Sequence, residues 1–278
     1  MLAVEGAWVK LGGVDVLRGA DLHAGAGRLV AVVGPNGAGK STLVRAAAGL
    51  QRLERGRVAW NGEDVARLRG RRLARLRAFV PQRARVPDGV RVHEAVAIGR
   101  APHLSPLRSP TRGDRDAVQR AMARAGVLGF ADRRLTTLSG GELQRVQVAV
   151  ALAQDAPALL ADEPTSSLDL GATALMARLL RGLADDGLAV VLVVHDLALA
   201  AAVADAVVVV SAGQTVAAGP PAAILTPRLL ADVWHVAADL VTDAGRTALH
   251  VDWLRRALPS EPAAVALTSP TESPQECR

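Results

Sequence analysis

The sequence contains little cysteine, few aromatic residues and almost no lysine. Cys277 is the single cysteine among 278 residues and stands one position before the C-terminal residue. An intrachain disulfide and a cysteine-based zinc cluster are therefore excluded, and a reducing compartment is the natural setting for such a chain. Tyrosine is absent and aromatic residues make up only 2% of the chain, which leaves few rings for stacking on nucleic acid bases.

The positive charge comes almost entirely from arginine. The formal net charge is +6 and the sequence pI is about 10.9, yet Lys10 and Lys40 are the only lysines. A basic chain fits partners such as nucleic acid or an anionic membrane surface. The arginines are spread along the sequence, however, which favours a general compositional bias. The densest run, RLRGRRLARLR at 67–77, has leucines at helical spacing and predicts the solvated basic face of a helix.

Long apolar runs without charge are also missing. The N-terminal MLAVEGAWVK lacks a basic region followed by an apolar stretch, so we expect no signal peptide. The most apolar stretch, 188–210, is long enough to cross a bilayer, but His195, Asp196 and Asp205 interrupt it and each would be costly in lipid. This stretch therefore predicts strand, loop, short helix and strand. We expect a soluble chain that reaches a membrane only through a partner.

The pattern of apolar runs predicts an α/β fold with a mainly parallel sheet. Hydrophobic residues make up 50% of the chain and charged residues 22%, as in an ordinary globular protein. Four short apolar runs, each typical of a strand buried on both faces, alternate with helical stretches; they span 29–33, 158–161, 189–194 and 206–210. Prolines and helical segments such as 114–126 predict a helical insert at about 85–150. Prolines, serines and threonines at 259–278 predict a disordered tail.

A phosphate-binding loop follows the first of these apolar runs. Residues 34–42 read GPNGAGKST and match G-x-x-x-x-G-K-[ST] between a predicted strand and a predicted helix. The glycines let backbone N–H groups surround phosphate oxygens, and the helix points the positive end of its dipole at the same anion. Lys40 is expected to bridge the β- and γ-phosphates, Ser41 to bind Mg²⁺ and the N–H of Thr42 to face the α-phosphate. The motif predicts nucleoside triphosphate binding.

A second acidic site follows the run at 158–161. Asp162 and Glu163 are adjacent carboxylates at the end of a predicted strand, and Pro164 then turns the chain. Asp162 can reach the Mg²⁺ that Ser41 also holds. Glu163 leaves on the other side of the chain and could polarise an attacking water. Since ligands of open α/β sheets bind beyond the carboxyl ends of the strands, we expect these groups to share one site with the phosphate loop.

Residues 138–142 read LSGGE and are followed by LQR. On the residues alone, a serine and two glycines at a helix start form a second anion cradle, and Glu142 completes a capping box with Ser139. The segment resembles the signature sequence of ABC-type ATPases. The order of the phosphate loop, Gln82, LSGGE, the acidic pair, SSLD at 166–169 and His195 is similar to the order in that family. The resemblance covers residues of about 3–230.

The resemblance implies a fold, a set of partners and residue roles. It implies a P-loop NTPase core with an N-terminal antiparallel β subdomain, within one ATP-binding domain at 1–258. It implies a head-to-tail homodimer in which each LSGGE closes over the γ-phosphate held by the other chain. Gln82 would contact Mg²⁺ or the water, Asp169 the dimer interface and His195 the γ-phosphate and Glu163. The implied cofactors are ATP and Mg²⁺.

The expected site residues fall into three groups. The catalytic residues are Glu163, His195 and Gln82; the Mg²⁺ ligands are Ser41, Gln82 and Asp162; the nucleotide-binding residues are Gly34, Pro35, Asn36, Gly37, Ala38, Gly39, Lys40, Ser41, Thr42, Ser139, Gly140, Gly141, Glu142 and Asp169. The chain departs from the family at the adenine, which an aromatic side chain usually contacts. Leu11 stands at the matching place, and Trp8 or Val16 are the alternatives.

The segment GRAPHLSPLRSP and the region AAGPPAAILTPRLLADVW resemble ATPases of importers for ferric siderophores, heme and cobalamin. The resemblance therefore implies an ATPase at the cytoplasmic face of the membrane that serves a separate permease and, indirectly, a substrate-binding protein. A groove near Gln82 and 85–105 would hold a short helix of the permease. One alternative is an ABC ATPase acting on DNA or ribosomes, although we expect no nucleic acid partner because the chain has neither a sustained heptad run nor a second GKST. A simple phosphate-loop kinase is a further alternative, but it leaves LSGGE unexplained.

Overall fold

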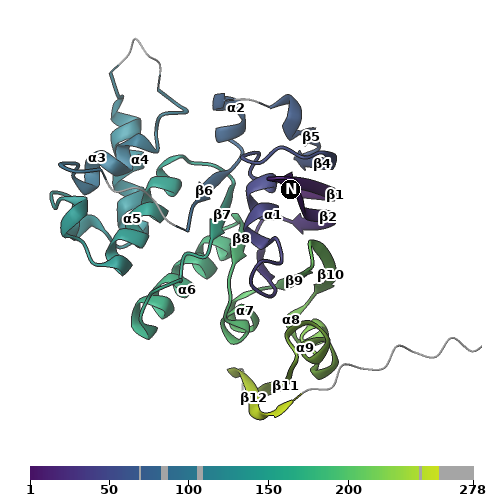
Figure 1. The fold of residues 1–278 in the computed structure, drawn as a ribbon. Helices are drawn as coiled ribbons and strands as arrows, with labels where there is room; N and C mark the ends of the chain where they lie inside the picture. The colour runs from purple at the N-terminus through teal and green to yellow at the C-terminus, as the bar shows by residue number, and fades with distance from the viewer. Residues whose placement is uncertain (69, 83–86, 105–108, 244–245, 257–278) are drawn as a thin grey trace, which may run out of the picture.

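The computed structural model describes residues 1–68, 70–82, 87–104, 109–243 and 246–256. Its centre is a six-stranded sheet in which all strands are parallel except the edge strand β10 (Figure 1). In spatial order the strands are β10 (Gln214–Gly219), β9 (Ala206–Ser211), β3 (Leu29–Val33), β8 (Ala189–Val193), β7 (Ala158–Asp162) and β6 (Ala78–Val80). The four apolar runs of the sequence are the four central strands, so the expected α/β class with a mainly parallel sheet is confirmed.

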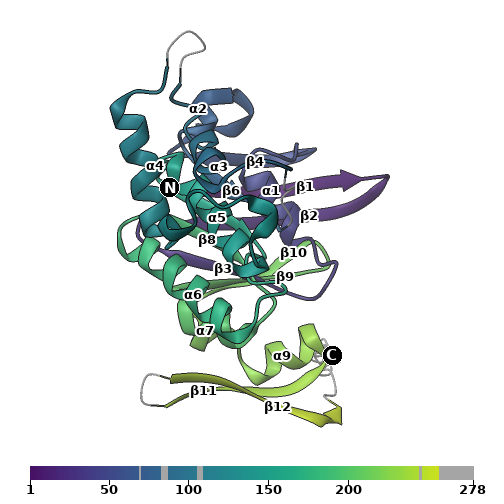
Figure 2. The same ribbon diagram turned by 90° about the vertical axis from the view of Figure 1, so that its left-hand side faces the viewer.

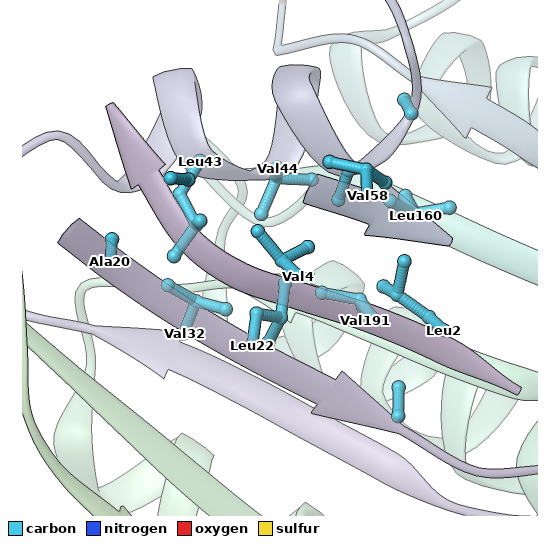
Figure 3. Packing of buried hydrophobic residues seen from close by; sticks show 14 of the residues in the cluster. Leu2, Val4, Ala20, Leu22, Val32, Leu43, Val44, Val58, Leu160 and Val191 are labelled. Carbon is cyan, nitrogen blue, oxygen red and sulfur yellow. The ribbon is translucent and has the colours of Figure 1, made fainter. Parts of the chain in front are cut away.

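A second, antiparallel sheet covers one face of the central sheet. In spatial order its strands are β2 (Val14–Ala24), β1 (Leu2–Leu11), β4 (Arg55–Trp60) and β5 (Glu63–Asp64). Helix α1 (Lys40–Ala47) lies between the two sheets, and Val4, Leu22, Leu43 and Val191 meet in the core that joins these layers (Figure 3). The side chains of this core are buried because alternate residues of β1 and β2 point toward α1. The N-terminal antiparallel subdomain is thus present.

Helices and a C-terminal hairpin cover the opposite face of the central sheet. The helices are α6 (Leu170–Asp185), α7 (Leu197–Val203), α8 (Pro221–Ile224) and α9 (Pro227–Trp234). The hairpin consists of β11 (Val236–Asp243) and β12 (Arg246–Arg256) and lies against α7 and α9 (Figure 2). The sequence pattern did not predict this hairpin. Leu240, Leu249 and Val251 pack on the same apolar cluster as α6 and α7. This packing stabilises a sheet of only two strands.

Three helices form a separate body on the side of β6 and β7 (Figure 1). They are α3 (Val92–Ile98), α4 (Arg112–Arg124) and α5 (Gly140–Ala153), with the 3₁₀ turns η2 (Leu128–Phe130) and η3 (Leu135–Thr137) between them. These helices have their own apolar cluster. Inside it, Arg100 donates to Asp114 at 3.1 Å, and the hydroxyl of Thr111 lowers the pKa of Asp114 to about 2. The residues expected for the helical insert are therefore organised around a core distinct from that of the sheet.

The basic run at 67–77 differs from its expected form. It contains the end of a 3₁₀ turn, η1 (Val65–Arg67), and the five-residue helix α2 (Gly70–Ala74), rather than one continuous helix. Leu68 and Leu73 are buried as their spacing predicted, and Arg71 and Arg72 are exposed. Arg77 was expected in solvent and is instead buried, because its Nε donates to the carbonyl of Ala48 at 2.6 Å.

The stretch at 188–210 folds as its charges predicted. It forms strand β8, the short helix α7 and strand β9, and Asp196 caps the start of α7 by accepting from the N–H of Leu199. Within the described ranges, no helix combines the length and the hydropathy that crossing a bilayer requires. The expected tail at 259–278 lies outside the described residues.

Candidate nucleotide site

A cleft of about 380 Å³ opens at the carboxyl ends of β3, β7 and β8. The loop from β3 to α1 forms one wall, and residues that follow β6, β7 and β8 form the other. The residues that line the cleft are Val16, Asn36, Gly37, Gly39, Lys40, Ser41, Thr42, Gln82, Glu163 and His195. Parallel strands bring these segments together at one edge of the sheet, so residues far apart in the sequence face one space.

Glycines give the loop of 34–39 its path. Gly34 has φ 151°, and a Cβ there would lie 2.0 Å from the carbonyl oxygen of Val210 on the neighbouring strand β9. Gly39 is the N-cap of α1 with φ 102°, in the left-handed region that favours glycine. The N–H of Gly213 donates to the carbonyl of Ala38 at 3.0 Å and holds the loop from the side of β10. The loop is thereby fixed with its backbone at the mouth of the cleft.

Lys40 is the buried cation of the loop. Its Nζ donates to the carbonyls of Gly34 and Pro35, each at 2.9 Å. Burial lowers the pKa of Lys40, and the negative charges of Glu163 and Asp162 offset part of this change. An ammonium group held by neutral carbonyls keeps most of its charge free for an incoming anion.

Ser41 and Asp162 form a pair of oxygen donors beneath the loop. The hydroxyl of Ser41 donates to Oδ1 of Asp162 at 2.7 Å, and Asp162 is 0% exposed. Mg²⁺ prefers such hard oxygen ligands and is usually held by one or two carboxylates together with the phosphates of a substrate. No cluster of three His, Cys, Asp or Glu side chains suited to a metal occurs among the described residues. The hydroxyl and carboxylate oxygens of Ser41 and Asp162 fit a Mg²⁺ ion that arrives with a nucleotide.

Arg45 is the cation that faces Asp162 in this structure. Its Nη2 lies 3.3 Å from Oδ2 of Asp162, on the opposite side of the carboxylate from Ser41. Arg45 was not among the site residues expected from the sequence. The spacing in the sequence could have indicated Arg45 as a site residue, because Ser41 and Arg45 are four residues apart on one helix and so share a face.

We expect Arg45→Gln to lower the free energy of unfolding by about 1–2 kcal/mol, since it leaves the buried carboxylate of Asp162 without its cation. The expected loss of unfolding free energy is small because the Arg45 side chain is 49% exposed and water screens its charge. Urea denaturation of the single variants Arg45→Gln and Asp162→Asn and of the double variant measures the coupling. If the losses of unfolding free energy in the two single variants add up to the loss in the double variant, the interaction between Arg45 and Asp162 is contradicted.

Glu163 is held between two side chains. Its Oε1 lies 2.6 Å from Nε2 of His195, and its Oε2 accepts from the amide of Gln82. Glu163 has φ 52°, a conformation that is rare outside glycine and that turns the chain away from β7 after Asp162. The N–H of Glu163 donates to the carbonyl of Val193 at 3.2 Å, which helps to hold this turn. One carboxylate thus connects segments that follow β6, β7 and β8.

The LSGGE segment lies outside this cleft. Ser139 is the N-cap of α5 and forms a capping box with Glu142, whose carboxylate accepts from the N–H of Ser139 at 2.8 Å. That hydrogen bond lowers the pKa of Glu142. The cap predicted from the sequence is therefore present, while Ser139 and Gly140 are exposed and do not line the cleft.

Asp169 lies close to the LSGGE segment. It is the N-cap of α6 and accepts from the N–H of Ala172 at 2.7 Å. A Cβ on Gly141 would lie 3.1 Å from the Cβ of Ala172, so the start of α5 packs directly on the start of α6. Next to Asp169, Leu170 is 87% exposed. The structure thus divides the expected residues into a cleft around Lys40 and Glu163 and a separate exposed surface around Ser139 and Asp169.

Comparisons with known proteins agree with this architecture. Residues 17–166 match the family model described as ABC transporter. A protein of Streptomyces coelicolor, "Hemin import ATP-binding protein HmuV", is 46% identical over 84% of this chain and 83% of its own length. The solved structure "An inward-facing conformation of a putative metal-chelate type ABC transporter" superposes with a TM-score of 0.77 at 26% identity, covering 90% of this chain and 96% of that one.

A second solved structure is a dimer. "Dimeric Structure of MJ0796, a Bacterial ABC Transporter Cassette" has a TM-score of 0.69 at 27% identity and covers 80% of this chain and 99% of that chain.

The family model spans more than half of the residues, and the phosphate loop, the acidic pair and the helical body stand in one fold. The chain belongs to the ABC transporter family, as an ATP-binding subunit.

Proposed function

We propose that this chain hydrolyses ATP, as a homodimer, to drive import of a metal chelate through a separate permease. The observation that carries the proposal is the single cleft that contains Lys40, Ser41 and Glu163. A cation and a metal-binding hydroxyl lie there with a carboxylate that is already oriented by hydrogen bonds. Phosphoryl transfer to water needs these three kinds of group.

In this proposal the loop and Lys40 bind the triphosphate. Backbone N–H groups of 34–42 surround its oxygens, and the Lys40 ammonium neutralises charge on the β- and γ-phosphates. Ser41 and Asp162 would hold Mg²⁺, which would neutralise charge that develops on the phosphate oxygens. Glu163 accepts a proton from the attacking water, and His195 and Gln82 hold its carboxylate in place.

The exposed surface around Ser139 supports the homodimer. Ser139 and Gly140 are exposed at the start of α5, where the first N–H groups of a helix lack partners within the helix, and neither residue lines the cleft of its own chain. Leu170 presents an apolar side chain beside Asp169, as a surface covered by a partner would. A head-to-tail pair places the Ser139 surface of one chain over the cleft of the other.

The names of similar proteins support a permease partner and a metal chelate as the transported compound. One relative is named for hemin import and one structural neighbour for metal-chelate transport. The GRAPHLSPLRSP segment begins at Gly99, at the end of α3, and its residues 105–108 lie outside the described residues. We infer that a heme, iron chelate or cobalamin is the cargo, that a binding protein delivers it, and that this chain sits peripherally at the cytoplasmic face of the membrane.

Complementation between two defective chains tests the shared site. Lys40→Ala damages the loop and Ser139→Arg damages the opposing surface, so each variant alone has a defect in both sites of its dimer. A mixture forms heterodimers in which one site combines the intact Lys40 loop with the intact Ser139 surface. Phosphate release should reappear on mixing, to at most about a quarter of the wild-type rate per chain for random pairing.

The matched control mixes Lys40→Ala with Glu163→Gln, because both substitutions damage the cleft of the chain that carries them and leave its Ser139 surface intact. In that heterodimer each site still has one defect, so mixing should restore nothing. Full activity of Ser139→Arg by itself, or no recovery in the first mixture despite demonstrated heterodimers, would rule out a site shared between two chains.

A further inference from the structure

The arginines of the chain are unevenly distributed. Residues 52–77 contain nine arginines and three carboxylates, whereas residues 109–243 contain ten arginines and fifteen carboxylates. A uniform compositional bias would raise the number of arginines in both regions, but it would not leave one of them basic and the other acidic. The excess of positive charge is therefore local.

The fold gathers six of these arginines on one surface, which we name the basic surface. A Cβ on Gly49 would lie 2.7 Å from Val65 and 2.8 Å from Leu73, so the loop after α1 packs directly on η1 and α2. The segments 50–57 and 65–75 are thereby neighbours. The six arginines are all exposed; they are Arg52, Arg57, Arg67, Arg71, Arg72 and Arg75.

Most of these guanidinium groups have no carboxylate partner. Arg57 donates to the carbonyl of Gly62 at 3.2 Å and Arg75 donates to that of Pro102 at 3.0 Å, and both acceptors are neutral. Among the described residues, no hydrogen bond or ion pair involves the side chains of Arg52, Arg67 and Arg71. Guanidinium groups placed in this way keep their charge for an external anion.

The carboxylates near the basic surface do not balance its charge. Those on or beside it are Glu5, Glu54, Glu63 and Asp64, which are fewer than the six arginines. Glu63 forms an ion pair with Arg72 at 2.6 Å, and Asp64 accepts from the N–H of Ala66 at the start of η1. The surface therefore keeps a positive net charge.

A groove of about 710 Å³ lies within the basic surface. Arg52 and Arg57 line it together with the apolar side chains of Leu53 and Val65. Leu50 also lines the groove and is 55% exposed. Cations beside an exposed leucine match the boundary between phosphate headgroups and acyl chains, where charge and hydrocarbon meet.

The basic surface adjoins the region expected to hold a helix of the permease, near Gln82 and 85–105. The hydrogen bond from Arg75 to Pro102 joins α2 to this region. In Figure 1, α2 lies at the same end of the molecule as α4, opposite to α9 and the C-terminal hairpin. A chain seated beneath a permease through this region would turn the basic surface toward the bilayer.

We propose that the basic surface binds anionic phospholipid headgroups directly, so that the chain contacts the bilayer itself as well as a permease. The inference goes beyond the proposed function and uses it only for the position of the chain beside a membrane. Guanidinium groups suit phosphate because they donate two parallel hydrogen bonds to it. An anionic bilayer presents its phosphates as a broad layer, which matches cations spread over a loop, a strand and two short helical segments.

Nucleic acid is the other polyanion to consider, and it fits this surface less well. Trp60 is the single aromatic residue of 49–77 and is buried, so the surface offers no ring for stacking on bases. Lipid vesicles are therefore the probe, and duplex DNA is the comparison.

Co-sedimentation of the full-length chain with vesicles tests the proposal without ATP or a permease. The vesicles contain either phosphatidylcholine alone or phosphatidylcholine with about 30% of the anionic lipid phosphatidylglycerol. We expect the chain to bind the anionic vesicles only. Binding should disappear at about 0.5 M salt, because salt screens exposed charges.

Arg67→Glu combined with Arg71→Glu should weaken binding to the anionic vesicles by at least about 25-fold, since each arginine near a bilayer contributes about fivefold. Arg178→Glu combined with Arg228→Glu is the matched control, because it makes the same change in net charge at exposed positions of α6 and α9. The control should bind as the wild type does. An unchanged affinity for ATP in calorimetric titration shows that each variant is folded.

Four results would overturn the proposal: no binding to anionic vesicles, equal binding to neutral ones, binding that persists at about 0.5 M salt, or equal losses in the two double variants. Binding of duplex DNA without binding of vesicles would overturn it in favour of nucleic acid. If the chain hydrolyses no ATP, the proposed function fails, while vesicle binding still decides this inference because it needs no nucleotide.

Discussion

Glu163→Gln is expected to reduce the rate of ATP hydrolysis by at least about 100-fold while ATP still binds. The amide keeps the size of the side chain and its ability to bond His195 and Gln82, but it cannot accept a proton from water. The loop residues that would hold the triphosphate are untouched. Binding and chemistry should therefore separate in this variant, with the loss falling on kcat.

In the proposed homodimer, hydrolysis of ATP would let the two chains separate, so the same variant should accumulate as a dimer with bound ATP. Light scattering of Glu163→Gln with Mg-ATP would show the doubled mass, and the wild type would return to monomer as it consumes its substrate. Glu54→Gln, at an exposed glutamate away from the cleft, is the matched control and should behave as wild type. Undiminished turnover of Glu163→Gln would remove Glu163 from the chemistry.

Lys40→Ala should weaken ATP binding by about 10- to 100-fold, the range expected for loss of a charged hydrogen-bonding partner. The buried ammonium donates to Gly34 and Pro35 within the loop, and it is the cation that the loop itself contributes to the cleft. Titration calorimetry with a non-hydrolysable ATP analogue measures the change. Hydrolysis should fall with it, since the same charge stabilises the phosphates during transfer.

The chain provides an unusually close control, because Lys10 is its other lysine. Lys10 lies on β1 in an exposed ion pair with Asp15 at 3.7 Å. Such surface pairs contribute little to stability, so Lys10→Ala should bind ATP as the wild type does. Equal weakening in the two variants would point to general charge rather than to the loop.

The sequence predicted the central sheet because the strands carry their own signal. Leu29–Val33 and Ala189–Val193 are buried on both faces, and a strand buried in this way must be apolar at every position. Because these strands are parallel, their carboxyl ends lie at one edge of the sheet, and the residues that follow each strand were expected there. The cleft with Lys40, Glu163 and His195 is a direct consequence of parallel strands.

Other features depend on contacts that the sequence pattern does not carry. The hairpin of β11 and β12 is held by packing on α7 and α9, and neither strand shows a strong pattern by itself. Arg77 reads as one more surface arginine, yet it is buried because the carbonyl of Ala48 lies within reach of its guanidinium. The place of Val16 in the cleft likewise depends on close approach between β2 and two distant glycines.

Gly213 ties the phosphate loop to strand β2. Its N–H donates to Ala38 in the phosphate loop, and its carbonyl accepts from Arg18 on β2 at 2.8 Å. Its φ of 81° and the missing side chain let both contacts form at once. A side chain at this tight turn would meet the carbonyl oxygen of Val16 at 2.6 Å and press β2 away from the phosphate loop, so a position with no chemistry of its own helps to set the shape of the cleft.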